Sequence, residues 1–141
     1  MAITSGMCRS FKKECLQGIH DFSADTIKVA LFTSAATLSP DTTAYATTNE
    51  ATGTGWSAGG IALPVTSGYP AVDAGSGFGV VRFDDTNALD VTVTFRAVLI
   101  YNASKANRAI MVLDRGIDVV ITAGPIDFLT NHVSPYLIVI A

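Results

Sequence analysis

Charged side chains are scarce in this sequence. They make up 15% of its 141 residues, against about 25% in an average soluble domain. The formal net charge is −3 and the isoelectric point is about 5.1, so there is no broad positive field to attract nucleic acid. We interpret the shortage of charge as a sign that parts of the surface are covered by partner proteins.

Long apolar runs are also missing, and no stretch approaches the roughly 18 residues that a membrane-spanning helix needs. Arg9, Lys12, Lys13 and Glu14 interrupt the first apolar segment, so we expect no secretory signal and assembly in a cytosol-like compartment. The hydrophobic share of 49% and the mean hydropathy of +0.41 exclude a disordered chain. The length fits one domain spanning residues 1–141.

Cysteine is represented only by Cys8 and Cys15, too few for a disulfide scaffold. In a helix these positions are separated by about 10 Å, beyond the roughly 7 Å limit for a disulfide, so both should stay unpaired. Together with His20 they offer three zinc ligands, but without the closely spaced cysteine pair typical of zinc sites. We therefore expect them to pack as small apolar residues.

Apolar periodicity predicts one helix followed by strands. Residues 7–20 repeat every three or four positions, which predicts an N-terminal helix with Lys12, Lys13, Glu14 and Gln17 facing solvent. Residues 27–32 alternate with a period of two and predict a strand covered mostly on one side. Residues 91–96 also alternate, and this pattern runs on into an all-apolar stretch that ends at Tyr101. Shorter strand-like runs occupy residues 61–65, 79–83, 109–113, 119–122 and 136–140.

This pattern predicts an all-β domain, a jelly roll or β-sandwich of about eight short strands with a short N-terminal helix. Pro64 places 61–65 at a sheet edge, and the Ala123–Gly124–Pro125 stretch predicts a turn. Residues 33–60 lack periodicity, and a loop of that length is usually functional or ordered by a partner.

One literal catalytic motif occurs, Gly55-Trp56-Ser57-Ala58-Gly59, the G-x-S-x-G pattern of hydrolases. That motif works at a sharp turn between a buried strand and a helix, and neither is predicted here. Asp84, Asp85, Asn87 and Asp90 suggest calcium, but the glycine of an EF-type loop is missing. His132 stands alone. We therefore predict no catalytic residue, no metal and no cofactor.

Two groups of residues are candidates for contact with a partner. Arg9, Lys12 and Lys13 place three of the nine basic residues in the predicted helix. The second group is aromatic, since aromatic side chains are favoured at interfaces and these lie in glycine-rich stretches. It consists of Trp56, Tyr69 and Phe78.

Several stretches resemble a known family. They are FKKECLQGIHDF (11–22), TIKVALFTS (26–34), Asn49-Glu50, GTGWSAGG (53–60) and IYNASKANRA (100–109). In this order and spacing the chain resembles the jelly-roll cement (capsid-decoration) proteins of short-tailed bacteriophages with an HK97-like capsid. The resemblance runs from residue 11 to about residue 113 and is weaker over 67–90.

The resemblance implies a non-enzymatic protein on the outer surface of the virion. It would bind the major capsid protein, bridge neighbouring subunits against DNA pressure, and associate as a homodimer, without nucleic acid, membrane or cofactor. Three alternatives stay open. These are a tail- or fibre-associated phage structural protein, a carbohydrate-binding β-sandwich that stacks sugars on Trp56 and Tyr69, and a small hydrolase using Ser57.

Overall fold

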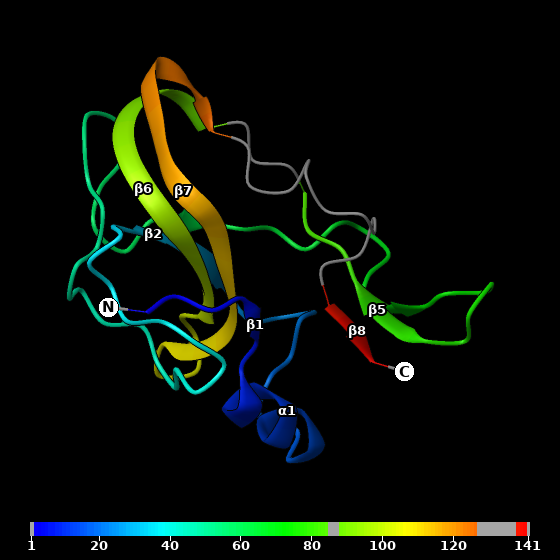
Figure 1. Ribbon diagram of the computed structural model, residues 1–141. Coiled ribbons are helices and arrows are strands. Elements are labelled where there is room, and N and C mark those ends of the chain that lie inside the picture. Colours follow the sequence, from blue (N-terminus) through cyan, green and yellow to red (C-terminus); the bar gives the residue numbers. More distant parts are fainter. Residues whose placement is uncertain (1, 85–87, 127–137, 141) are drawn as a thin grey trace.

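The computed structural model describes residues 2–84, 88–126 and 138–140, and within them the fold is all-β with one short helix, as predicted (Figure 1). The elements in chain order are β1 (Gly6–Met7), α1 (Arg9–Leu16), β2 (Ile27–Phe32), β3 (Ile61–Ala62), β4 (Ala71–Val72), β5 (Gly79–Val81), β6 (Ala88–Asn102), β7 (Arg108–Ile126) and β8 (Ile138–Ile140). His132 and the first two residues of the predicted strand 136–140 lie outside the described residues.

The strands form two antiparallel sheets. One has five strands in the order β1-β7-β6-β2-β3, and the other has three in the order β4-β5-β8. β3 lies at an edge and is followed by Pro64, in agreement with the prediction from that proline. Val81 and Ile138 of the small sheet belong to the same buried cluster as β2, β6 and β7, so the two sheets share a core.

A long β6–β7 hairpin forms the centre of the larger sheet (Figure 1). The runs 109–113 and 119–122, predicted as separate strands, are both part of β7. Between them the register shifts, because Phe95 pairs with Val119 whereas Ala97 pairs with Asp114. β7 therefore bulges at this point instead of ending. The residues 123–125, predicted as a turn, likewise lie inside β7. The pairing with β6 shifts register beside them, and a strand accepts a proline such as Pro125 at an irregularity of this kind.

The larger sheet is covered on both faces, so the one-sided burial predicted for β2 is wrong. Every residue of β2 except Lys28 is buried. On one face, Tyr45 of the 33–60 segment stacks on Tyr101, with ring centroids 4.5 Å apart. The opposite face is covered by α1 and the residues after it. There Phe22 makes edge contacts with Phe11 of α1 and with Phe83.

The chain itself orders the 33–60 segment. The Glu50 carboxylate accepts hydrogen bonds from the Tyr45 hydroxyl and the Gly59 amide, both at 2.7 Å, and the Tyr101 hydroxyl donates to the Gly59 carbonyl at 2.7 Å. Burial is the largest cause of the raised pKa of Tyr45, and the bond to Glu50 adds to it. This segment is therefore a fixed layer on the sheet and needs no partner to order it.

The helix is shorter than the predicted range of 7–20. Met7 belongs to β1, where it pairs with Met111 of β7, and Cys8 is the N-cap residue of α1. At the other end the Gly18 amide donates to Cys15 and the Ile19 amide to Glu14, while Gly18 has φ +69°. This is the Schellman arrangement that ends a helix at a glycine, and it turns the chain back along α1.

Candidate functional site

A buried polar network holds α1 on the sheet. Glu14, predicted to face solvent, is 5% exposed instead. One of its carboxylate oxygens lies 2.8 Å from His20 Nε2, and the other accepts a hydrogen bond of 2.7 Å from Arg108. The chain reversal at Gly18 brings His20 back to Glu14, and the start of β7 supplies Arg108. Glu14 and Arg108, 94 positions apart in the chain, thus meet on the inner face of α1.

The hydrogen bonds fix the tautomer of the buried His20 ring. The Ser104 amide donates to Asn102 Oδ1 at 3.0 Å, and Asn102 Nδ2 donates to Asp25 at 2.7 Å. Asn102 therefore turns its Nδ2 toward His20 Nδ1, 3.0 Å away, and that nitrogen must accept. The proton of the neutral ring is consequently on Nε2, from which it is donated to Glu14.

Both carboxyls of the network ionise more readily than usual. Burial opposes the charge on Glu14, but hydrogen bonds from His20 and Arg108 outweigh burial and lower its pKa. The same holds for Asp25, whose pKa is lowered by the Asp21 amide, Asn102 and Lys105 despite burial. The network therefore contains stable negative charge and ties α1 to the β6–β7 turn.

Sequence reasoning missed this network. Glu14 occupies a helix position that the apolar pattern assigns to solvent. Its partner Arg108 is far away in the chain, and so is Asn102, which bonds to its other partner, His20. The one signal was Asn102 itself, a single amide directly after the apolar stretch 97–101, since a buried amide requires partners.

Turning Glu14 inward leaves the outer face of α1 basic. Lys12 and Lys13 are exposed, and no acidic side chain among the described residues pairs with either. Arg9 instead forms an exposed ion pair with Asp41. Of the three basic candidates, the two lysines therefore offer unpaired charge.

The three aromatic candidates do not form one surface. Trp56 is 2% exposed and part of the core, so its prediction as a contact residue is wrong. Its buried indole has no free face on which a sugar could stack. Tyr69 is half-buried, whereas Phe78 is 39% exposed. Tyr69 precedes β4 and Phe78 precedes β5, both strands of the small sheet, while Trp56 belongs to the 33–60 segment beside β6.

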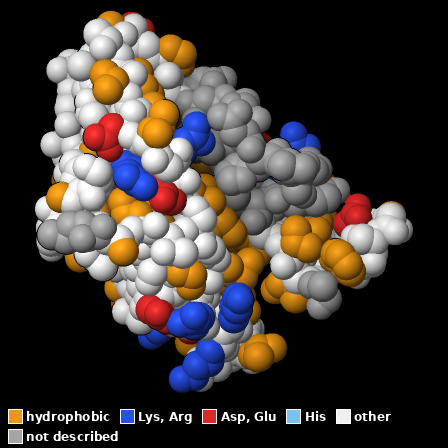
Figure 2. Space-filling model, viewed as in Figure 1, with side chains coloured by type: hydrophobic (Ala, Val, Ile, Leu, Met, Phe, Trp, Pro, Cys, Tyr) orange, Lys and Arg blue, Asp and Glu red, His pale blue; other side chains and the backbone are white. Residues whose placement is uncertain are grey.

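A groove opens between α1 and the three-stranded sheet, and we call it the α1 groove. It has a volume of about 240 Å³, and its apolar lining includes Cys15, Phe22, Pro70, Val81, Ile138 and Ile140. His20 also borders it, with both ring nitrogens engaged by the buried network. Figure 2 shows Lys and Arg side chains gathered around α1 and hydrophobic side chains on the small sheet across from it.

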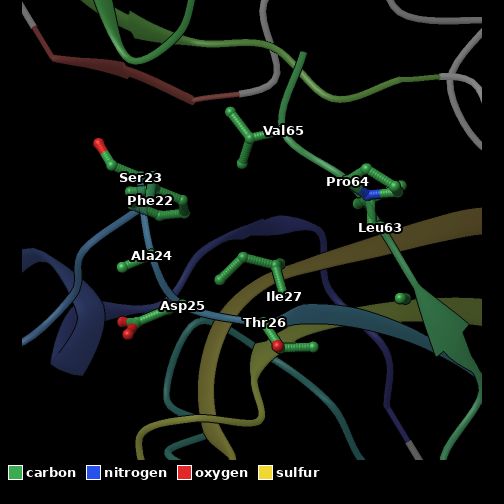
Figure 3. A pocket seen from close by; sticks show the side chains of 10 residues that line it. Phe22, Ser23, Ala24, Asp25, Thr26, Ile27, Leu63, Pro64 and Val65 are labelled. Carbon is green, nitrogen blue, oxygen red and sulfur yellow. The ribbon is translucent and has the colours of Figure 1, made fainter. Parts of the chain in front are cut away.

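A second hollow of about 300 Å³ lies between residues 22–27 and 62–65. Phe22, Ile27 and Val65 point into it, whereas the Asp25 carboxylate points away, toward its partners in the network (Figure 3). Its one ionisable side chain is thus committed elsewhere.

Searches of known protein families, curated proteins and solved structures find no match to this chain. Its function must therefore be argued from its own residues.

Two further observations concern the described residues alone. In residues 2–84, 88–126 and 138–140, no three His, Cys, Asp or Glu side chains are placed to hold a metal ion together. In the same part of the chain, no helix has the length and apolar character needed to cross a membrane.

Ser57 of the G-x-S-x-G motif is exposed and sits just after a tight turn in which the Gly53 and Trp56 backbones bond to each other. Neither a strand nor a helix flanks it. The strand-to-helix turn that exposes a catalytic serine in that motif is therefore not formed here.

Both cysteines are free, as predicted, and they should differ sharply in reactivity. Burial, followed by the charge of Glu14, raises the pKa of Cys8 to about 11, and the same causes raise the pKa of the half-buried Cys15. We expect iodoacetamide at mildly alkaline pH to modify only Cys15 in the native protein and both in denaturant, as read by intact mass. Two rapid native adducts would contradict the burial of Cys8.

Proposed function

We propose that this protein is a structural component of a tailed-phage virion. It decorates the outside of the capsid and cements the shell by bridging neighbouring capsid subunits. The role is mechanical and involves no catalysis. The proposal starts from the sequence stretches that resemble capsid-decoration proteins, and the structure adds two supporting observations.

The first observation is that the resembling stretches meet in space. Glu14 and His20 of the 11–22 stretch bond to Arg108 and Asn102 of the 100–109 stretch. The 49–50, 53–60 and 100–109 stretches meet where Glu50 bonds to Gly59 and Tyr101 bonds to Gly59. We call this group the Glu50 cluster. The resemblance thus covers the internal framework of the fold, whereas 67–90, where it is weak, contains the β4–β5 hairpin with its exposed turn.

The second observation, on which the bridging role depends, is two separate regions of exposed apolar side chains. Ile117 and Val120 are 71% and 68% exposed on β7. Val72, at 71%, and Ile140, at 54%, lie on the small sheet. Contiguous exposed apolar surface marks protein–protein contacts, and we propose that both regions contact capsid subunits. A protein with two such regions on different elements can hold two subunits at once.

Homodimer formation remains part of the proposal. The sheets end in short edge strands, β1, β3, β4 and β8, and edge backbone groups are a template for pairing with a second copy. Sedimentation equilibrium would show a dimer at micromolar concentration, and a monomer throughout would contradict this part.

Stepwise dissociation of purified virions tests the location. We expect the protein to leave with the shell fraction when virions are treated with increasing chaotrope, and recombinant protein to rebind stripped capsids. Release with the tail would instead support the alternative of a tail- or fibre-associated protein. Absence from virions would refute the proposal.

The exposed lysines of α1 should contribute to the grip on the shell through charge. We expect Lys12→Glu and Lys13→Glu each to weaken rebinding to stripped capsids by on the order of 1 kcal/mol or less, with a reduced salt dependence. Unchanged occupancy and an unchanged salt slope would show that this face of α1 is merely solvated.

A further inference from the structure

We infer that the α1 groove receives an apolar side chain from an extended segment of the capsid subunit, and that Asp or Glu residues flank that side chain. This inference rests on the proposed function and specifies the chemistry of the contact. It goes beyond capsid binding because it identifies where the partner enters and what the entering segment must carry.

The lining of the groove selects an apolar group. Cys15, Phe22, Val81, Ile138 and Ile140 present carbon and sulfur. The nitrogens of His20 are taken by Glu14 and Asn102. With the ring of His20 so engaged, burying a polar group here without a partner would be unfavourable. A volume of about 240 Å³ is below the range of about 300–1,000 Å³ of small-molecule pockets, so one or two side chains suit it best.

An apolar band continues beyond the groove on both sides. Leu16 is 92% exposed and directly follows Cys15 on α1. Across the groove Ile140 pairs with Gly79, which pairs with Val72, so these residues form one row across the small sheet. A segment crossing the groove would cover the whole band.

The rim determines the charge of the segment. Lys12 is one helical turn from Cys15, which lines the groove, and from the exposed Leu16 beside it. Lys12 and Lys13 have no acidic partner among the described residues, since Glu14 is turned inward and Asp41 pairs with Arg9. Carboxylates flanking the inserted side chain would supply the missing charge.

Gly79 allows the groove to be filled without disturbing the fold. A Cβ at this position would lie 3.9 Å from the Ile140 carbonyl oxygen, which is ordinary contact. We therefore expect Gly79→Val to fold normally and to lower capsid affinity by roughly tenfold or more. Gly75→Val is the matched control, because Gly75 lies in the same hairpin and has comparable space. Equal binding by wild type and a stably folded Gly79→Val would overturn the inference while leaving capsid decoration intact.

Cys15 reports directly on occupancy of the groove. We expect its alkylation in intact virions to be at least about tenfold slower than in the free protein, since a covered site reacts only when it opens. In a second variant, Ser57→Cys supplies a thiol on the opposite layer that should stay reactive. Unchanged reactivity of Cys15 would refute the inference. Protection that increases with the concentration of the free protein would identify a second copy as the occupant and overturn it equally.

Zero-length carbodiimide coupling on virions tests the charge of the segment. We expect Lys12 or Lys13 to be joined to an Asp or Glu of the capsid subunit adjacent to an apolar residue, as read by peptide mapping. Coupling of these lysines only to carboxylates of this protein itself would contradict the inference. If the protein is missing from virions, the proposed function fails and the inference fails with it.

Discussion

Gly60→Ala should destabilise the protein by about 3 kcal/mol or more. Gly60 directly precedes β3 and lies so close to β2 that a Cβ would be 1.7 Å from the Val29 carbonyl oxygen, and its φ is +67°. An L side chain in the left-handed region costs about 1–2 kcal/mol, and forced overpacking adds about 1–3 kcal/mol. Neither β2 nor the Glu50 cluster can move away without breaking other bonds. Urea denaturation of the two proteins measures the difference.

Gly18 provides the control that separates the two causes. Its φ of +69° is nearly the same, but nothing lies within 4 Å of a Cβ placed there. Gly18→Ala should therefore cost only the conformational strain, about 1 kcal/mol. If Gly18→Ala and Gly60→Ala are equally destabilising, the close approach of the 33–60 layer to β2 is not as described.

Glu14→Leu should lower the free energy of unfolding by about 3 kcal/mol at neutral pH, because it leaves the buried His20 ring and the half-buried Arg108 guanidinium without their acceptor. Glu14→Gln keeps the shape of the side chain, but its amide NH2 would face either the His20 or the Arg108 donor, which then lacks an acceptor. This substitution should therefore cost about 1–3 kcal/mol. Chemical denaturation at pH 7 measures both.

The same carboxylate should give the protein an acid-sensitive stability. The pKa of Glu14 is lowered on folding from its ordinary 4.5, and those of Asp25 and Asp114 from 3.8. Their contribution is therefore complete above these ordinary values and is lost as the pH falls through the lowered ones. We expect stability to fall below about pH 4.5 in wild type and to fall less steeply in Glu14→Gln.

Asp41→Asn is the matched surface change. Asp41 pairs with Arg9, and both side chains are about 70% exposed. Neutralising it should change stability by less than about 1 kcal/mol and leave the acid dependence intact. An identical pH profile for wild type and Glu14→Gln would show that the inward carboxylate does not carry the acid response.

Local patterns predicted the elements of this fold well where local forces decide them. The apolar patterns in 27–32 and 91–101 located β2 and the body of β6, and Pro64 located an edge. The helix was predicted in the right place but too long, because periodicity continued past the Gly18 reversal that stops it. Periodicity reports burial, whereas helix ends depend on backbone hydrogen bonds.

The candidate site depended on contacts that local patterns do not contain. A glycine-rich context suggested an exposed Trp56, yet Gly53 and Gly55 do the opposite. A Cβ on Gly53 would lie 1.9 Å from the Thr92 carbonyl oxygen, and one on Gly55 2.7 Å from that of Asp90. The glycines let this segment lie against β6, and the indole is buried as a result. Glu14 likewise turns inward because His20 reaches it across the chain reversal and Arg108 reaches it from β7.

The position of β2 in the larger sheet has a consequence during synthesis. Its six residues, Ile-Lys-Val-Ala-Leu-Phe, pair chiefly with β6, whose matching residues are made roughly 70 positions later. At translation rates of about 5–20 residues per second, β2 waits several seconds for its partner. Short apolar segments of this kind aggregate readily while unpaired. Lys28 is the single charge among them, and it acts as a gatekeeper that keeps the nascent strand soluble until the hairpin emerges.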